Sequence, residues 1–231
     1  MKFNFKKSQF LFLAAGLVAQ MAYAIGPGTY VTERGWGLLT VSNKQTFEIS
    51  AIGANGHSCN LGGKVKGSKG IVDAETPDER CEVSFTPKGK GFAVDSTVDS
   101  CREYCGMRAG FEGDYFPQPT ECAGAATKAA KNGFIQQYKA KQYAGAYQQL
   151  SKYQQNCGKY MDWLETDQVA NDLAITAYHQ GDKALCLKHL KTTMGWGIAN
   201  LAALEEELPP TDFISYKGIA KATWYNRKLC E

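Results

Sequence analysis

Histidine is scarce in this chain, with 3 residues among 231. A metal site built from paired ligands and a base-assisted nucleophile both commonly need histidine. His57 falls in a predicted turn, His179 lies beside another, and His189 lies on a lysine-rich helix face. We interpret all three as surface or capping residues. The sequence therefore predicts no metal site and no catalytic residue.

Other signatures of catalysis are also missing. The chain has no Gly-x-Ser-x-Gly nucleophile elbow, and GGKVKGSKG at residues 62–70 does not match the phosphate-loop pattern. The adjacent acids Glu205, Glu206 and Glu207 point around a predicted helix, which is typical of a solvated face. We expect no cofactor and no enzymatic activity, with an uncharacterised enzyme as the third alternative for the function.

Long apolar runs are absent after the first 24 residues. Lys2, Lys6 and Lys7 precede the apolar run from Phe10 to Ala19, and Ala22-Tyr23-Ala24 is a small-x-small cleavage site. These features are typical of a bacterial secretory signal peptide cleaved after Ala24. The run is too short to span about 30 Å of hydrocarbon. We predict an exported, periplasmic protein without membrane insertion.

A net charge is also missing from the predicted mature chain. The full chain has 26 basic and 23 acidic residues, and three lysines lie in the predicted signal peptide, so 23 of each sign remain. Nucleic-acid binding needs a basic footprint, so we expect no nucleic-acid partner. Residues 25–122 carry a charge of −3 and residues 123–231 carry +3. This division favours a basic partner for the first half.

Cysteine, by contrast, is plentiful, and an even number in an exported chain is typical of disulfides. CREYC at residues 101–105 separates two cysteines by three residues, whereas a redox dithiol is usually Cys-x-x-Cys. We interpret this stretch as a staple that fixes a loop. The sequence does not determine the pairing, although Cys59 and Cys81 fall in predicted strands and could join them. The eight cysteines are Cys59, Cys81, Cys101, Cys105, Cys122, Cys157, Cys186 and Cys230.

The first half, residues 25–122, reads as short strands. Phe47, Ile49 and Ala51 alternate with polar residues, and this period of two indicates one buried face. Asn55-Gly56 is a hairpin turn signal, and residues 87–91 form a second turn. Successive hairpins predict an antiparallel meander, either a small barrel or a sandwich. The predicted strands are GTYVTE, WGLLTVS, QTFEISAIG, SCNLGGKV, CEVSFTP and GFAVDS.

The second half, residues 123–231, has helical periodicity instead. Two helices are predicted on either side of Lys141-Gln142, and two more on either side of Gly181-Asp182. The two segments superpose with an offset of forty. Their matched pairs are Tyr138 with Tyr178, Ala144 with Ala184, Ala146 with Cys186, and Leu150 with Leu190.

This aromatic–turn–small–leucine pattern resembles the tetratricopeptide repeat, in which an aromatic residue closes the first helix and a small residue lets the second pack against it. The usual period is shorter, so this chain has extra residues between its units. A third pair is expected from TDFISYKGIAKATWYNRKLC, after Pro209-Pro210. The alternative is a disulfide-tied helical bundle. The predicted class is α+β, with three cysteines in the helical half and five before it. If all pair, at least one disulfide crosses between halves, and Cys122 is the natural candidate.

The stretches GANGHSCNLGG, CEVSF and CREYCGMRAGFEGDY resemble the amino-terminal domains grouped with bacterial lysozyme-inhibitor-type proteins. Known periplasmic lysozyme inhibitors insert a Ser-Gly-x-x-Tyr loop into the enzyme. Here Ala109-Gly110 followed by Tyr115 only distantly matches that loop, so no inhibitory residue is carried over. The resemblance implies an inhibitor or immunity factor against a peptidoglycan-cleaving enzyme.

Two functions from different classes follow from these observations. The first is the inhibitor, whose partner is a peptidoglycan hydrolase. The second is a structural adaptor, whose helical repeats hold a component of an envelope assembly such as a secretion system. In both, the partner is another protein. The candidate binding residues are Arg102, Tyr104 and Arg108 in the stapled loop, and Tyr138 and Tyr178 in the repeats.

Overall fold

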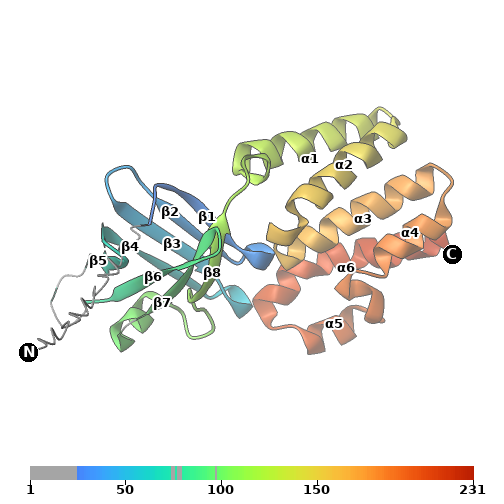
Figure 1. Cartoon of the computed structure of the whole chain (residues 1–231). Coiled ribbons are helices and arrows are strands. Elements are labelled where there is room, and N and C mark those ends of the chain that lie inside the picture. The colour runs from blue at the N-terminus through green and yellow to red at the C-terminus, as the bar shows by residue number, and fades with distance from the viewer. Residues whose placement is uncertain (1–24, 74–75, 77–79, 97) are drawn as a thin grey trace, which may run out of the picture.

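A computed structural model describes residues 25–73, 76, 80–96 and 98–231, and the predicted signal peptide at 1–24 lies outside this range. An antiparallel β-barrel comes first, and helices follow it (Figure 1). The predicted α+β class is confirmed. Of the two architectures left open for the first half, the closed barrel is the one observed.

Each strand of the barrel pairs with the strand before it, and β1 closes the sheet by pairing with β8. Closure matters because an open sheet would leave an edge strand with unpaired backbone groups. The strands are β1 (Gly28–Thr32), β2 (Gly37–Val41), β3 (Thr46–Ile52), β4 (Ser58–Lys66), β5 (Lys69–Val72), β6 (Glu82–Lys88), β7 (Gly91–Ser96) and β8 (Gly113–Pro117).

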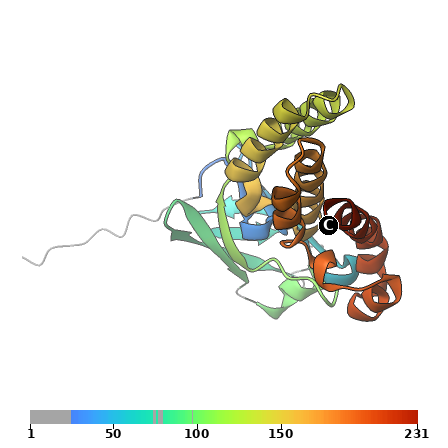
Figure 2. The same cartoon turned by 90° about the vertical axis from the view of Figure 1, so that its right-hand side faces the viewer.

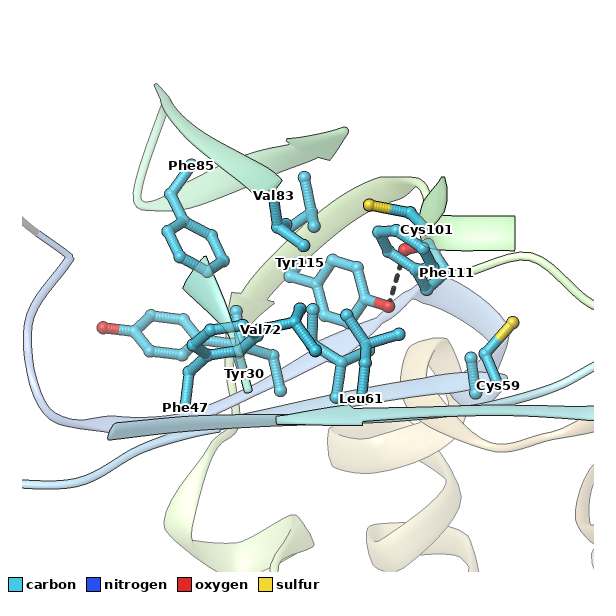
Figure 3. Close-up of a cluster of buried hydrophobic side chains, with 14 of the residues drawn as sticks. Tyr30, Phe47, Cys59, Leu61, Val72, Val83, Phe85, Cys101, Phe111 and Tyr115 are labelled. Carbon is cyan, nitrogen blue, oxygen red and sulfur yellow. Dashed lines mark hydrogen bonds between the residues drawn. The ribbon is translucent and has the colours of Figure 1, made fainter. Parts of the chain in front are cut away.

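The barrel is filled by the alternate side chains that the period of two predicted. Phe47, Ile49 and Ala51 on β3 are buried, and their neighbours are exposed. The rings of Phe47 and Phe85 meet edge to face with centroids 5.5 Å apart. Tyr115 is also fully buried, and its hydroxyl donates to the carbonyl of Phe111 at 2.8 Å (Figure 3). The buried hydroxyl therefore keeps a hydrogen-bond partner, as burial requires.

Two strands were not predicted. The GGKVKGSKG segment does more than link strands, because β4 continues to Lys66 and a turn at Gly67 leads into β5. Strand β8 lies in a segment that was interpreted as part of the stapled loop. It pairs with both β1 and β7, and so supplies the closure.

The helices form antiparallel hairpins beside the barrel (Figures 1 and 2). Lys141 and Gly181 both adopt a left-handed backbone, with φ of 58° and 84°. The residue after each donates its amide to a carbonyl five residues back, at 2.9 and 3.0 Å. The two turns thus repeat at the predicted offset of forty. The helices are α1 (Gly124–Lys139), α2 (Tyr143–Cys157), α3 (Trp163–His179), α4 (Lys183–Leu190), α5 (Leu201–Glu207) and α6 (Pro210–Cys230).

The predicted third pair differs from the observed one. TDFISYKGIAKATWYNRKLC forms one continuous helix, α6, because Pro210 occupies a first-turn position where its missing amide hydrogen is tolerated. Its partner in the hairpin is the shorter α5, which precedes the two prolines. Within the described part of the chain, none of the helices combines the length and the apolar character that crossing a bilayer requires.

All eight cysteines are paired, as predicted, and the Cys122–Cys157 disulfide ties the end of the barrel segment to α2. Cys59 and Cys81 do not join each other. Strand β5 pairs with β4, which holds Cys59, on one side and with β6, which begins just after Cys81, on the other. Two strand spacings amount to about 10 Å, which is beyond the reach of a disulfide. The pairs are Cys59–Cys105, Cys81–Cys101, Cys122–Cys157 and Cys186–Cys230.

Candidate functional site: a clamped loop and a junction cavity

The CREYC stretch is fixed to the barrel at both ends. Cys101 is linked to Cys81 and Cys105 is linked to Cys59, so its two cysteines bridge to different partners rather than to each other. Between and after them the chain makes a 3-10 turn and a tight bend before β8. We call residues 101–110 the clamped loop. Its cross-links act as the staple that the sequence predicted.

Hydrogen bonds hold the clamped loop as well. Arg102 donates from Nη2 to the carbonyl of Met107 at 2.8 Å and from Nη1 to that of Ala109 at 3.2 Å. The amide of Gly106 donates to the carbonyl of Ser58 at 2.9 Å. The guanidinium of Arg102, a predicted binding residue, is thus hydrogen-bonded to the loop's own backbone. Few backbone groups of the loop remain free to move.

The loop presents a methionine and an arginine to solvent. Met107 is 80 % exposed, the largest value among the exposed large hydrophobic side chains, and Arg108 beside it is exposed. Tyr104 is half-buried against the barrel core, and its hydroxyl lies 3.5 Å from the carbonyl of Asp73. Sequence reasoning named Arg108 but missed Met107. The signal available was an apolar residue placed between glycines in the segment GMRAG.

The barrel and the helices meet at a second place of interest, near η1 (Glu33–Gly35) and η6 (Gly158–Tyr160). Gly35 has φ of 61° and packs so closely on the backbone of Tyr160 that a Cβ atom would overlap its carbonyl oxygen. Lys159 pairs with Glu33 at 2.9 Å and lies over the Phe116 ring at 4.7 Å. These contacts seat the start of α3 against the barrel.

The turn between β3 and β4 makes the other contact of the junction. The amide of Asn55 donates to Asp212 Oδ2 at 2.9 Å, and the amide of Thr211 donates to Asn55 Oδ1 at 3.0 Å. Asn55 and Gly56 both have positive φ, as the Asn-Gly turn signal predicted. The turn therefore caps the first turn of α6.

Two adjoining hollows open between these contacts, with volumes of about 510 and 530 Å³. Arg34, Trp163 and Met194 line both, and we call the pair the junction cavity. Trp163 is 40 % exposed and stacks on buried Tyr216 with ring centroids 5.2 Å apart. Ile52, at 66 % exposure, lines the larger hollow. The junction cavity is thus an apolar recess with a cation at its wall.

A carboxylate also lines the smaller hollow. Asp167 on α3 is only 6 % exposed, and its Oδ2 accepts hydrogen bonds from the Tyr216 hydroxyl and the Met194 amide. Burial raises the pKa of Asp167, and these two hydrogen bonds partly oppose that rise. A buried carboxylate keeps its charge only where hydrogen bonds or a bound ligand stabilise that charge.

The two tyrosines predicted in the repeats both contact one histidine. His179 Nε2 lies 3.0 Å from the Tyr138 hydroxyl, and the rings of His179 and Tyr178 meet edge to face at 5.5 Å. Tyr143 stacks on the same imidazole at 4.5 Å. Burial raises the pKa of the Tyr138 hydroxyl. The structure thus gathers an aromatic cluster at the ends of α1 and α3.

The cysteines and one of the histidines have partners in the structure. Every cysteine is oxidised, and His189 lies 2.9 Å from the Tyr147 hydroxyl. Among the described residues, no group of three or more histidine, cysteine, aspartate or glutamate side chains could hold a metal ion.

No family model, curated protein or solved structure matches the chain.

Proposed function

We propose that the protein is a non-catalytic, periplasmic binding protein that inhibits, or gives immunity against, a peptidoglycan-cleaving enzyme, and that the clamped loop makes the contact. The observation that carries this proposal is the 80 % exposure of Met107 on a loop tied by two disulfides. A loop already fixed in one conformation loses little entropy on binding. Methionine and arginine are both enriched at protein interfaces.

The compartment and the charge also support this proposal. Four disulfides are typical of an oxidising, extracytoplasmic location. Residues 25–122, which hold the loop, carry a charge of −3, and this favours association with a basic enzyme. The resemblance of this half to lysozyme-inhibitor-type domains points to the same partner class.

The test is capture and inhibition with the mature protein. Lysozyme and the cell's own peptidoglycan hydrolases are assayed against the wild type and the double variant Met107→Ala/Arg108→Ala. We expect the wild type to bind and inhibit one of them, and the double variant to bind at least about tenfold more weakly, equivalent to about 1.4 kcal/mol. Lys90→Ala, in the exposed turn after β6, is the matched control and should bind like the wild type. If no such enzyme is bound, the proposal is wrong.

A second candidate is the envelope adaptor, and the aromatic cluster of the helices favours it. Tyr143 stacks on His179, and Tyr225 on α6 is 64 % exposed. Exposed tyrosines are frequent anchors for protein partners. The variants Tyr143→Ala and Tyr225→Ala separate the two functions in the same capture experiment. An adaptor loses its partner in these variants and keeps it when Met107 and Arg108 are replaced.

A further inference from the structure

The junction cavity has charges of opposite sign on walls that come from different parts of the fold. Arg34 belongs to η1 of the barrel segment, and Asp167 belongs to α3, yet both line the hollow of about 510 Å³. A ligand with only negative charge would be repelled by the Asp167 carboxylate, and a ligand with only positive charge would be repelled by the Arg34 guanidinium. A ligand that carries both charges matches both walls.

The carboxylate has one oxygen available. Asp167 Oδ2 accepts its two hydrogen bonds from Tyr216 and Met194, whereas Oδ1 has no hydrogen-bond partner among the described residues. Among the described residues, Ser151 Oγ is the one fully buried side-chain oxygen or nitrogen that lacks a hydrogen-bond partner. Asp167 Oδ1 also lacks a partner, so it is not fully buried. Asp167 lines the smaller hollow although the residue is only 6 % exposed. It is placed to accept hydrogen bonds from a ligand ammonium group.

The guanidinium is also available. Arg34 is exposed and makes no salt bridge within the described residues, while its neighbour Glu33 is taken up by Lys159. Arg34 has φ of 64°, a left-handed conformation that is strained for a non-glycine residue. Strained residues of this kind cluster at ligand-binding positions. The strained conformation of Arg34 lies directly before Gly35, which packs closely against the backbone of Tyr160.

Two further acids of the cavity hold the backbone of the fold. Asp162 accepts the amide of Glu165 at 2.7 Å as the N-cap of α3, and Asp212 accepts the amide of Asn55 at 2.9 Å. Asp162 and Asp212 line the larger hollow, whereas Asp167 lines the smaller one together with Arg34. The rest of the lining is mixed. Trp163 and Met194 are shared by both hollows, and three threonines also line the smaller one, Thr166, Thr192 and Thr193.

We propose that the junction cavity binds a short peptide with free termini, with its carboxylate on Arg34, its ammonium on Asp167 and its apolar side chains on Trp163 and Met194. The two adjoining hollows, of about 510 and 530 Å³, give room for more than one residue. Pockets of this size with a few convergent polar groups are typical small-ligand sites. This proposal does not depend on the clamped loop or on its enzyme partner.

The test uses leucyl-leucine as the probe, with the mature protein and isothermal titration calorimetry at pH 7. N-acetyl-leucyl-leucine removes the ammonium, and leucyl-leucinamide removes the carboxylate. We expect leucyl-leucine to bind at least tenfold more tightly than either blocked peptide. Arg34→Gln should abolish the preference over the amide and leave the preference over the acetylated peptide. Asp167→Asn should do the reverse, and Lys44→Gln, on an exposed turn, is the control for a lost charge.

Several results would overturn the proposal. These are no binding of leucyl-leucine at millimolar concentration, equal binding of the free and blocked peptides, or an unchanged preference in Arg34→Gln. Asp167→Asn keeps the acceptor for Tyr216, and thermal unfolding checks that it folds. If it does not fold, Arg34→Gln with the three peptides still decides the result, because Arg34 is exposed and makes no salt bridge within the described residues.

Discussion

The guanidinium of Arg102 donates a hydrogen bond to the carbonyl of Met107 across 2.8 Å. Arg102 thus holds the backbone of the most exposed large hydrophobic residue of the clamped loop. The second bond, to Ala109, holds the next part of the same bend. Charge-assisted bonds of this type are stronger than neutral ones. The loop's shape thus depends on one side chain as well as on its two disulfides.

The first prediction concerns this side chain. Arg102→Met removes both hydrogen bonds, each worth about 1.5–3 kcal/mol when one partner is charged. Local opening of the loop should become easier, and the amide of Ala109, which donates to the Gly106 carbonyl at 2.9 Å, should exchange with solvent at least about tenfold faster. Hydrogen exchange followed by mass spectrometry measures this. Arg108→Met is the control, and equal exchange in both variants would contradict the prediction.

The second prediction uses the repeated turn of the helical hairpins. Lys141 and Gly181 occupy equivalent left-handed positions, but only glycine adopts this conformation without a Cβ penalty. Lys141→Gly should therefore raise the free energy of unfolding by about 0.5–1 kcal/mol, and Gly181→Lys should lower it by about 1 kcal/mol. Urea denaturation measures both. Changes of the same sign would show that the two turns are not equivalent.

The third prediction concerns pH. Burial raises the pKa of Asp172 to about 6, although the hydrogen bond from Gln168 and the charge of Lys131 both lower it. A folded-state pKa above the unfolded value stabilises the protein at low pH, and this contribution is lost as the pH rises through about 6. Asp172→Asn should raise the free energy of unfolding at pH 7 by about 1–3 kcal/mol and change it little at pH 4. If the free energies of unfolding of the wild type and the variant differ by the same amount at pH 4 and at pH 7, the prediction is wrong.

The fourth prediction concerns the seat between the barrel and the helices. Gly35→Ala places a Cβ atom against the carbonyl of Tyr160 and strains a backbone with φ of 61°. The helices should shift away from the barrel, with a loss of stability of about 1–3 kcal/mol. Chemical denaturation measures the loss, and the fluorescence of Trp163, at this junction, should change with it. Gly124→Ala is the control, since a Cβ atom there meets open space. An unshifted Trp163 signal in the Gly35 variant would contradict the account.

Local patterns predicted much of the fold. Alternation in QTFEISA and the Asn55-Gly56 turn depend on neighbouring residues, and both were confirmed. Strand β8 was missed because its glycine and proline suggest a loop, and only its pairing with β1 and β7 makes it a strand. The pairing of Cys59 was missed for a related reason, since strand β5 separates it from Cys81.

The sequence predicted residues of the clamped loop but none of the junction cavity, again because only residues close together in the sequence give a local pattern. The clamped loop is local in sequence, so its cysteines and Arg108 could be named in advance. The junction cavity depends on Arg34 and Asp167, which are far apart along the chain and meet only when the helices pack on the barrel. Neither residue belongs to a motif, so periodicity and spacing give no signal for them.

The turn between β3 and β4 belongs to both binding surfaces. Gly53 and Ala54 line the larger hollow of the junction cavity, and the amide of Ala54 donates to the carbonyl of Arg108 in the clamped loop at 3.2 Å. If the proposed peptide displaced this turn on binding, the affinity of the loop for its proposed partner would change. Linkage then requires the partner to change the affinity for the peptide by the same factor. The protein would in that case respond to the peptide content of its surroundings.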